Sequence, residues 1–473
     1  MMHVAIPTSL SVADPSNNGS SYDVFKIYIN GSYHCTLRYS QLLRLHETIK
    51  SEYGDIDLPD FPPKKLKLIM SSKQKIERRE ALQQYLRAVC QHVITTNSRL
   101  VNEFFLEAQK DSALDSKECQ NLSDQLPIYL LDGSKTSVTC NVGDCTSIVI
   151  RRYAESVGLQ SQNVPLFGLF IVRKSNTCPY EIVRWLKDIE CPILSLLSVS
   201  GNSANGGKSS YKVVVRKCFW DLAFEKALTR DRVALNILYT QAVAEMLNWR
   251  TPSVLLGART HASSHWCQLN EDVLRQLQRL SEQGSAQEFL SLCASQTRYG
   301  FVYFEPCPSD YLANDQTVCV AAGNRQLLFL HKGQTGGLVE TLFRVTRIRC
   351  WKLSNQESEE TPNLSFEYLV CRNRLEWITL HSNQAIMISM CLQSMVDEII
   401  RCREVSVSGG EPYCSRSSTS TESPTSIDSG VASSFGSAKS KFTYESFGEL
   451  GNKKRNSSSM TNEAFNTITD DDL

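Results

Sequence analysis

Near the start of the chain, hydrophobic and polar residues alternate in two short segments, and apolar residues then recur with helical spacing. The dipeptide Asn30-Gly31 lies between the alternating segments and is typical of a tight hairpin. A proline-rich stretch, Pro59 to Pro63, separates the two helical patterns. The predicted elements are strands at Tyr22–Ile29 and Tyr33–Tyr39, helices at Gln41–Tyr53 and Glu77–Val89, and a closing segment at Phe104–Leu106.

A polar segment without apolar periodicity, Lys110–Gln125, follows and is interpreted as a linker. The next block has the order strand, strand, helix, strand, with which a ubiquitin-like fold begins. From Trp220 to about Ser295 the apolar spacing is helical. The elements predicted for the mixed block are a hairpin of Ile128–Leu131 and Ser137–Asn141, a helix at Ile148–Val157 and a strand at Leu169–Arg173.

After Tyr299 the pattern predicts strands again, then a helix at Gln384–Arg401. These strands are expected at Phe301–Phe304, Thr317–Ala321, Gln326–Leu330, Leu342–Trp351, Leu364–Val370 and Glu376–Leu380. Ser406–Leu473 contains 17 Ser and 7 Thr in 68 residues and few aliphatic residues. Such a segment buries too little apolar surface to offset its ordering entropy, so we expect it to be disordered.

Composition limits the classes of function. The 473 residues suggest about three domains. Lys+Arg and Asp+Glu both number 50, so no overall field attracts nucleic acid or membrane, and any basic site must be local. The 17 cysteines are odd in number and include no C-x2-C pair, which favours free thiols in a reducing compartment. Met1–Leu10 lacks the pattern of a signal peptide, and no apolar segment approaches the ~20 residues of a membrane span. We expect a cytoplasmic protein with peripheral membrane contact.

Basic and aromatic residues occur on three predicted elements of the first block. Arg38-Tyr39 ends a strand, Lys64-Lys65 follows a stiff Pro62-Pro63 loop, and Arg78-Arg79 opens a helix. Guanidinium groups bind phosphate through two parallel hydrogen bonds, and an ammonium adds a point charge. Each group alone is typical of a solvated surface. In this order they indicate a pocket for a phosphorylated ring.

This combination resembles the PX domain over about Tyr22–Lys110. The resemblance implies that Arg38 binds the 3-phosphate of phosphatidylinositol 3-phosphate, that the Tyr39 ring packs under the inositol, and that Lys64 meets the 1-phosphate. It also implies that Arg78 forms hydrogen bonds with the remaining inositol hydroxyls. Arg79 is the alternative residue for this role. The residues that follow Lys65 are either a short core segment or a loop that enters the headgroup region. These candidate membrane-insertion residues are Leu66, Leu68, Ile69 and Met70.

The whole folded part, from Met2 to Arg401, resembles the PX–FERM sorting nexins. Ser198–Lys208 and Leu247–Trp266 depart from that pattern and are interpreted as surface insertions. The stretches that carry the resemblance are Arg38–Leu43, Phe61–Leu66, Phe343–Arg347, Cys350-Trp351, Gln384–Met387 and Cys391–Glu398. The implied fold class is α+β and multidomain: a PX domain with a three-stranded sheet and a helical subdomain, a three-lobed FERM module and a disordered tail. Its expected bounds are PX 1–110, linker 111–125, ubiquitin-like F1 126–216, helical F2 217–296, PTB-like F3 297–403 and tail 404–473.

In this family the F3 lobe binds Asn-Pro-x-Tyr, Asn-x-x-Tyr or Asn-x-x-Phe motifs of receptor tails by adding the peptide as a strand. Trp351 and Val396 match the peptide-pocket positions, and Ile400 lies one helical turn after Val396. Without the resemblance, Trp351 would be interpreted as a core tryptophan and Val396 as an ordinary helix-packing residue.

The resemblance implies an endosomal cargo adaptor on the cytosolic face of early endosomes. Its expected partners are phosphatidylinositol 3-phosphate membranes, tails of integrin-type and lipoprotein-receptor-type proteins, and the retriever/Commander recycling complex. An acidic end closing on leucine, here Asp471, Asp472 and Leu473, would bind retriever. Independently of the family, Asn462-Glu463-Ala464-Phe465 fits the Asn-x-x-Phe form of the cargo motif. A tethered copy reaches about millimolar effective concentration, so we hypothesise that the tail occupies its own groove.

Other classes of function are less well supported. Asn202–Ser209 lacks the first glycine of a phosphate-binding loop, and a strand pattern rather than a helix follows it. Neither a zinc-binding histidine cluster nor a nucleophile elbow occurs, so we expect no enzyme activity, cofactor or metal. Asp428–Ser433 has the form of a phosphodegron, but chance is the better explanation for it in a serine-rich tail. The alternative function is a FERM-type membrane–cytoskeleton linker or signalling scaffold, which actin co-sedimentation would reveal.

Overall fold

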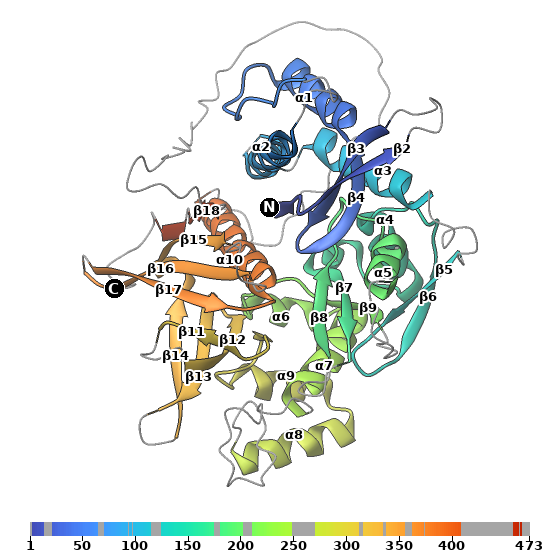
Figure 1. The fold of residues 1–473 in the computed structure, drawn as a ribbon. Helices are drawn as coiled ribbons and strands as arrows, with labels where there is room; N and C mark the ends of the chain where they lie inside the picture. The colour runs from blue at the N-terminus through green and yellow to red at the C-terminus, as the bar shows by residue number, and fades with distance from the viewer. Residues whose placement is uncertain are drawn as a thin grey trace, which may run out of the picture.

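The computed structural model describes four folded units and a short tail segment (Figure 1). It describes the chain except for residues 1, 14–20, 65–70, 93, 97, 115–123, 175–179, 202–210, 248–269, 312–315, 334–336, 355–361, 373, 408–456, 463 and 466–473. We call the units the N-terminal domain (residues 2–114), the ubiquitin-like lobe (124–217), the helical lobe (223–294) and the C-terminal lobe (299–407). No described helix has both the length and the apolar character needed to cross a membrane.

The N-terminal domain packs a sheet against helices. The sheet has four strands and not the three expected, because the two-residue strand Val4–Ala5 also pairs with its central strand. Its expected hairpin is confirmed: Asn30 and Gly31 both have positive φ, 51° and 81°, as a tight hairpin turn requires. In the sheet, β1 (Val4–Ala5) and β2 (Ser9–Ala13) pair with one side of β3 (Ser21–Ile29), and β4 (Ser32–Arg38) pairs with the other. The helices are α1 (Tyr39–Tyr53), α2 (Ser72–Gln91) and α3 (Arg99–Leu114).

Two predicted boundaries of this domain are wrong. Helix α2 begins at Ser72, five residues earlier than expected, because the Ser71 side chain accepts a hydrogen bond from the Gln74 amide and caps it. Helix α3 continues to Leu114, into the predicted linker. The physical reason is burial of Phe105 and Ala108 on its inner face, and the Ser112 hydroxyl accepts a hydrogen bond from the Thr36 amide at 2.9 Å.

The ubiquitin-like lobe has the expected strand, strand, helix, strand order. Its sheet runs β6-β5-β9-β7-β8, with β5 parallel to β9. Helix α5 extends to Gly201, so the predicted insertion at Ser198–Lys208 begins as helix. The elements are β5 (Gln125–Tyr129), β6 (Lys135–Thr139), α4 (Thr146–Val157), η3 (Ser161–Leu166), β7 (Phe167–Arg173), β8 (Glu181–Trp185), α5 (Pro192–Gly201) and β9 (Tyr211–Lys217).

The helical lobe follows the predicted helical spacing. It contains α6 (Ala223–Leu228), α7 (Arg232–Leu247), α8 (Glu271–Gln283) and α9 (Ala286–Ala294). The second predicted insertion, Leu247–Trp266, falls outside the described residues except for Leu247.

The C-terminal lobe is a strand-rich unit closed by one long helix, α10 (Ala385–Val407). The predicted single strand Leu342–Trp351 is wrong, because the one-turn helix η4 (Val345–Arg347) divides it. Val345 is fully buried and its amide donates to the Arg325 carbonyl, which turns the chain inward. The strands are β10 (Val302–Tyr303), β11 (Cys307–Ser309), β12 (Gln316–Gly323), β13 (Gln326–Lys332), β14 (Leu338–Arg344), β15 (Ile348–Ser354), β16 (Asn363–Cys371) and β17 (Arg374–His381).

A strand from the tail completes this sheet. Residues Ser457–Thr461 form β18, which pairs antiparallel with β15 at the sheet edge (Figure 1). The prediction that all of 404–473 is disordered is therefore wrong for these residues, and for 404–407, which continue α10. The sequence of β18 is polar, but the backbone donors and acceptors of an open sheet edge can order such a segment.

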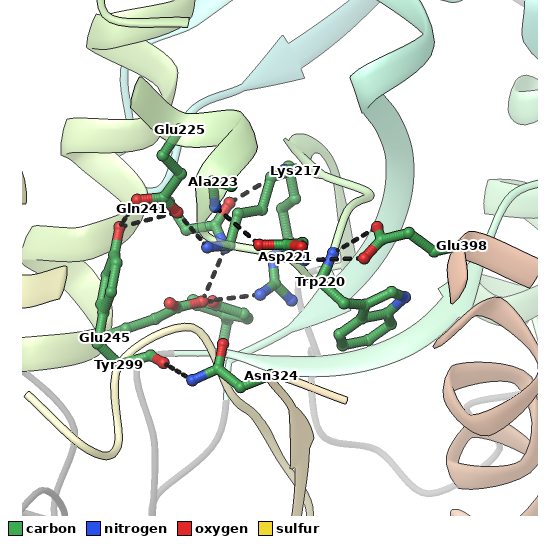
Figure 2. Close-up of polar contacts among 12 residues, drawn as sticks. Lys217, Trp220, Asp221, Ala223, Glu225, Gln241, Glu245, Tyr299, Asn324 and Glu398 are labelled. Atoms are coloured by element: carbon green, nitrogen blue, oxygen red, sulfur yellow. Dashed lines mark hydrogen bonds and ion pairs between the residues drawn. The ribbon is translucent and has the colours of Figure 1, made fainter. Parts of the chain in front are cut away.

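Polar contacts connect the three lobes with one another and with the segment that joins the ubiquitin-like lobe to the helical lobe (Figure 2). The Glu398 carboxylate of α10 accepts hydrogen bonds from the Trp220 and Asp221 amides, both at 2.8 Å. Nearby, Arg216 of β9 forms a buried ion pair with Glu245 of α7 at 2.7 Å. Since breaking a buried ion pair leaves an uncompensated charge, these contacts hold the lobes in one arrangement.

The N-terminal domain also packs on the lobes. The Gln109 side chain of α3 accepts a hydrogen bond from the Cys191 amide at 2.7 Å and donates one to the Ser195 hydroxyl at 3.1 Å. The tip of its hairpin reaches the C-terminal lobe: a Cβ at Gly31 would lie 3.2 Å from Cδ1 of Ile386 on α10. The first domain and the last lobe are therefore neighbours, although they are far apart in the sequence.

Candidate functional site

The first candidate site lies where β4 meets α1. Arg38 is the N-cap residue of α1 and its side chain is exposed. Its guanidinium lies over the Tyr22 ring, 3.7 Å from the centroid, and donates to the Tyr22 hydroxyl at 2.6 Å. A cation over an aromatic face is held in place while its remaining donors stay available. Tyr22 was not predicted, because the sequence carries no signal for it. It comes close to Arg38 in the folded sheet, where Val24, two residues later, pairs with Arg38.

Tyr39 and Arg78 form the second part of this pocket. The Tyr39 hydroxyl donates to the Pro62 carbonyl at 2.7 Å, so the proline-rich loop and α1 are held together. Arg78 of α2 donates to the Pro63 carbonyl at 2.9 Å and lies 4.8 Å from the centroid of the Tyr39 ring. Burial raises the pKa of Tyr39, with an opposing effect of the Arg78 charge. The next residue after this proline pair, Lys64, is exposed.

Arg79 has a different environment from Arg78. Its guanidinium donates to the carbonyls of Ile6 and Pro7, at 2.7 and 3.1 Å, and pairs with Glu80. It therefore attaches α2 to the chain after β1. This geometry favours Arg78 over Arg79 as the arginine that faces a ligand.

Within the described part of the chain, no carboxylate forms an ion pair with Arg38, Lys64 or Arg78. Arg38 lies over the Tyr22 ring and Arg78 over the Tyr39 ring, and neither guanidinium has a carboxylate partner there, which suits an anionic ligand. The four candidate insertion residues Leu66, Leu68, Ile69 and Met70 lie outside the described residues.

The second candidate site is the groove between β15 and α10, which we call the peptide groove. In this structure β18 lies in it, with Met460 opposite Trp351 and Thr461 opposite Cys350. Met460 is only 2% exposed. The contact has the form of β-augmentation, in which an extended segment adds a strand to a sheet edge.

Asn462 makes the most specific contacts of this segment. Its side-chain amide donates to the carbonyls of Val345 and Ile348, at 2.8 and 2.6 Å, where η4 leads into β15. Its own carbonyl accepts from the Phe465 amide at 3.1 Å, so Asn462 to Phe465 form a turn. Because both donors of one amide are used by two carbonyls, the site distinguishes asparagine from apolar residues and from aspartate.

Of the three residues predicted for this groove, Trp351 pairs with Met460 through β15, whereas Val396 and Ile400 lie on α10. Trp351 is fully buried, and its indole N–H donates to the Ser389 hydroxyl of α10 at 2.9 Å. Val396 is 2% exposed, and Ile400 is partly buried against the same hydrophobic cluster. Met460 and Ala464 belong to this cluster too, so the tail segment completes the core of the lobe. The contact residues Ser389 and Met460 carried no recognisable signal in the sequence.

Comparison with protein families gives three matches along the chain. Residues 26–108 match the PX domain, residues 124–220 match the F1 lobe of the FERM domain of sorting nexins 17, 27 and 31, and residues 300–400 match the Sorting Nexin 17 FERM C-terminal domain.

Individual proteins match over most of their length. Sorting nexin-17 of Danio rerio is 37% identical, covering 86% of this chain and 82% of that protein. Sorting nexin-17 of Rattus norvegicus is 34% identical over the full length of both chains. Sorting nexin-31 of Xenopus tropicalis is 27% identical, covering 85% of this chain and 89% of that protein. Among solved structures, the FERM and C-terminal domain complex of Drosophila Merlin is similar over 60% of this chain and 99% of the Merlin chain, with 13% identity and a TM-score of 0.39.

Proposed function

Since this chain belongs to the PX–FERM sorting nexins, with sorting nexin-17 as a relative along its full length, we propose that it is a non-enzymatic cargo adaptor of early endosomes. In this function the N-terminal domain binds phosphatidylinositol 3-phosphate, and the peptide groove binds Asn-Pro-x-Tyr, Asn-x-x-Tyr or Asn-x-x-Phe motifs of receptor tails. The tail then connects the loaded adaptor to a retriever-type recycling complex.

The membrane function rests on the pocket around Tyr39. Arg38 would bind the 3-phosphate, because its guanidinium is exposed and oriented by Tyr22. Lys64 would neutralise the 1-phosphate, and Arg78, which lies 4.8 Å from the centroid of the Tyr39 ring, would bond the inositol hydroxyls. The chain carries no net charge, so attraction to the membrane depends on this local group of cations.

The cargo function rests on the contacts of Asn462, which is the observation that carries the proposal. A segment of the form Asn-x-x-Phe already lies in the groove, with the asparagine bonded to the Val345 and Ile348 carbonyls. A receptor motif has the same asparagine and an aromatic residue three positions later, so it can make the same bonds. We propose that cargo displaces the tail segment, which is thus autoinhibitory.

The release of the tail has a consequence for Asp471, Asp472 and Leu473, which lie outside the described residues. They follow Phe465 within eight positions. While Asn462 and Phe465 are bound, a partner must approach these last residues close to the C-terminal lobe. We propose that displacement by cargo frees them for retriever.

A peptide titration tests the cargo function. In full-length protein with Phe465→Ala, the turn loses its aromatic residue and the tail competes less well. We expect an Asn-Pro-x-Tyr peptide to bind this variant roughly 10-fold more tightly than the parent. In the parent the tethered tail segment competes at about millimolar effective concentration, and the substitution weakens this competition. Isothermal titration calorimetry measures both affinities.

The matched control is Phe442→Ala, which removes a phenylalanine from the same tail away from the Asn462–Phe465 segment. It should bind the peptide as the parent does. Equal affinities for the parent and the Phe465→Ala variant would contradict autoinhibition, and absence of binding to both would contradict the cargo function.

A further inference from the structure

A serine hydroxyl lies at the centre of the peptide groove and joins three parts of the chain. Ser389 of α10 is fully buried. Its oxygen lies 2.9 Å from the Trp351 indole nitrogen of β15 and 3.6 Å from the Met460 sulfur of the tail segment. The groove therefore has a polar contact at Met460, two residues before the motif asparagine, although Met460 also belongs to a hydrophobic cluster.

The third part is the N-terminal domain, which contributes His3. The Nε2 atom of His3 lies 3.2 Å from the Ser389 oxygen, although the residues are 386 positions apart. Two hydrogen bonds attach the backbone of His3 to the β3–β4 hairpin. The His3 amide donates to the Asn30 side chain at 3.0 Å, and the His3 carbonyl accepts from the Asn30 amide at 2.8 Å. Asn30 is the first residue of the turn whose Gly31 packs against α10. The hairpin therefore fixes the position of His3 beside the groove.

The possible directions of these hydrogen bonds are limited by the groups involved. An indole N–H only donates, so the Ser389 oxygen accepts from Trp351. Ser389 then has one proton to donate, and both His3 Nε2 and the Met460 sulfur can accept it. If Ser389 donates to the sulfur, His3 must carry its proton on Nε2 and donate to Ser389. If the groove holds an aliphatic residue instead, His3 must accept the Ser389 proton.

His3 can take either role because it is neutral. Burial, with smaller contributions from the N-terminal amine and Arg87, lowers the pKa of His3 to about 3. A neutral imidazole is a donor on one nitrogen and an acceptor on the other, and the two tautomers exchange these roles.

We propose that His3 of the N-terminal domain is a specificity-determining residue of the peptide groove, which lets the position two residues before the asparagine accept a thioether or an aliphatic side chain equally. The proposal rests on the cargo function proposed above and extends it to this position. The lipid-binding domain is then part of the cargo site, and a C-terminal lobe without that domain has a different peptide preference.

The test compares two peptides in full-length protein whose groove is emptied by Asn462→Ala. One peptide has the sequence of residues 458–465, and the other has leucine in place of the methionine. With His3 present, the two should bind within about twofold of each other. With His3→Phe, which keeps a ring but has no acceptor, the Ser389 proton lacks a partner when leucine is bound. We expect the leucine peptide alone to weaken by roughly 5- to 10-fold, because an unsatisfied buried donor costs about 1 kcal/mol or more.

Two further variants separate this role from a general structural one. His3→Gln, whose amide can donate or accept, should restore equal binding of the two peptides. Ser389→Ala removes the hydroxyl, so His3→Phe should no longer change the ratio of the two affinities in that background. Calorimetry or fluorescence anisotropy measures every pair, and thermal unfolding checks that each variant is folded.

The outcomes for the inference and for the cargo function differ. If the Asn462→Ala chain binds neither peptide, the cargo function itself is contradicted and the inference with it. If it binds both peptides but His3→Phe leaves their ratio unchanged, or weakens both equally, only the role of His3 is overturned. Should His3→Phe fail to fold, His3→Leu replaces it, because its side chain also lacks an acceptor. An unchanged ratio of the two affinities in His3→Leu then overturns the role of His3.

Discussion

Arg38 and Asn462 illustrate what single residues reveal before and after the structure is known. Arg38 could be predicted, because a basic and aromatic pair at a strand end, a Pro-Pro-Lys loop and a second basic pair occur in a characteristic order. Tyr22, which orients Arg38, could not, because an aromatic residue 16 positions earlier carries no sign of that contact. Asn462 could be predicted from its motif, whereas Ser389 and His3 are brought together by tertiary packing alone.

Replacement of Arg38 tests the lipid pocket at the residue scale. Arg38→Ala removes the guanidinium that Tyr22 holds, and hydrogen bonds to charged groups contribute about 1.5–3 kcal/mol each. We expect at least a 10-fold loss of binding to liposomes that contain phosphatidylinositol 3-phosphate, measured by co-sedimentation. Arg44→Ala, an exposed arginine on α1 with the same change in charge, should bind nearly as the parent does. Undiminished binding of Arg38→Ala would refute the assignment of the pocket.

At the scale of elements, most strands and helices were predictable because their apolar periods are clear. The exceptions have physical causes. Strand β18 has no apolar period and exists through backbone pairing with β15, so local sequence could not reveal it. The division of Leu342–Trp351 by η4 depends on a contact between Val345 of η4 and Arg325 of the turn between β12 and β13, which are 20 positions apart. That division matters, since it places the Val345 carbonyl where Asn462 can reach it.

A glycine at the end of β12 is expected to support this arrangement. A Cβ at Gly323 would lie 2.6 Å from the Gly300 carbonyl oxygen and 2.7 Å from the Phe301 Cα, and backbone atoms cannot move aside cheaply. Gly323→Ala should therefore lower the free energy of unfolding by about 1–3 kcal/mol, as overpacking does. Thermal or chemical denaturation measures this change.

Gly337 provides the control in the same lobe, because a Cβ there would meet no atom within 4 Å. Gly337→Ala should leave the free energy of unfolding within about 0.5 kcal/mol of the parent. If both alanine variants are equally stable, the close approach at Gly323 is not a structural constraint.

The whole molecule combines a lipid pocket and a peptide groove in one packed unit. The N-terminal domain contacts the ubiquitin-like lobe through Gln109 and the C-terminal lobe through Gly31 and His3. The sequence predicted the order of the units, because each has its own pattern. Their arrangement was not predictable, since it depends on single contacts such as that of Glu398 with the Trp220 amide.

The proposed link to recycling belongs to this scale. Deletion of Leu473 removes the last apolar side chain and moves the terminal carboxylate, the two features that a terminal-capture site recognises. We expect the deleted chain to lose retriever subunits in a pull-down from cells while it keeps its affinity for liposomes and for cargo peptide. Retention of those subunits at the level of the full-length chain would exclude the last residue as the anchor.

We propose that this one chain joins a phosphoinositide membrane to a receptor motif, with its tail as the internal competitor. Vesicle flotation tests it most directly, with vesicles that carry phosphatidylinositol 3-phosphate, a lipid-anchored Asn-Pro-x-Tyr peptide, both or neither. We expect weak binding to each single signal and at least 10-fold stronger binding to both, because two linked contacts add avidity. Asn462→Ala should increase the binding further, because the competing tail segment is weakened. Equal binding to phosphoinositide vesicles with and without the peptide, unchanged by Asn462→Ala, would contradict it.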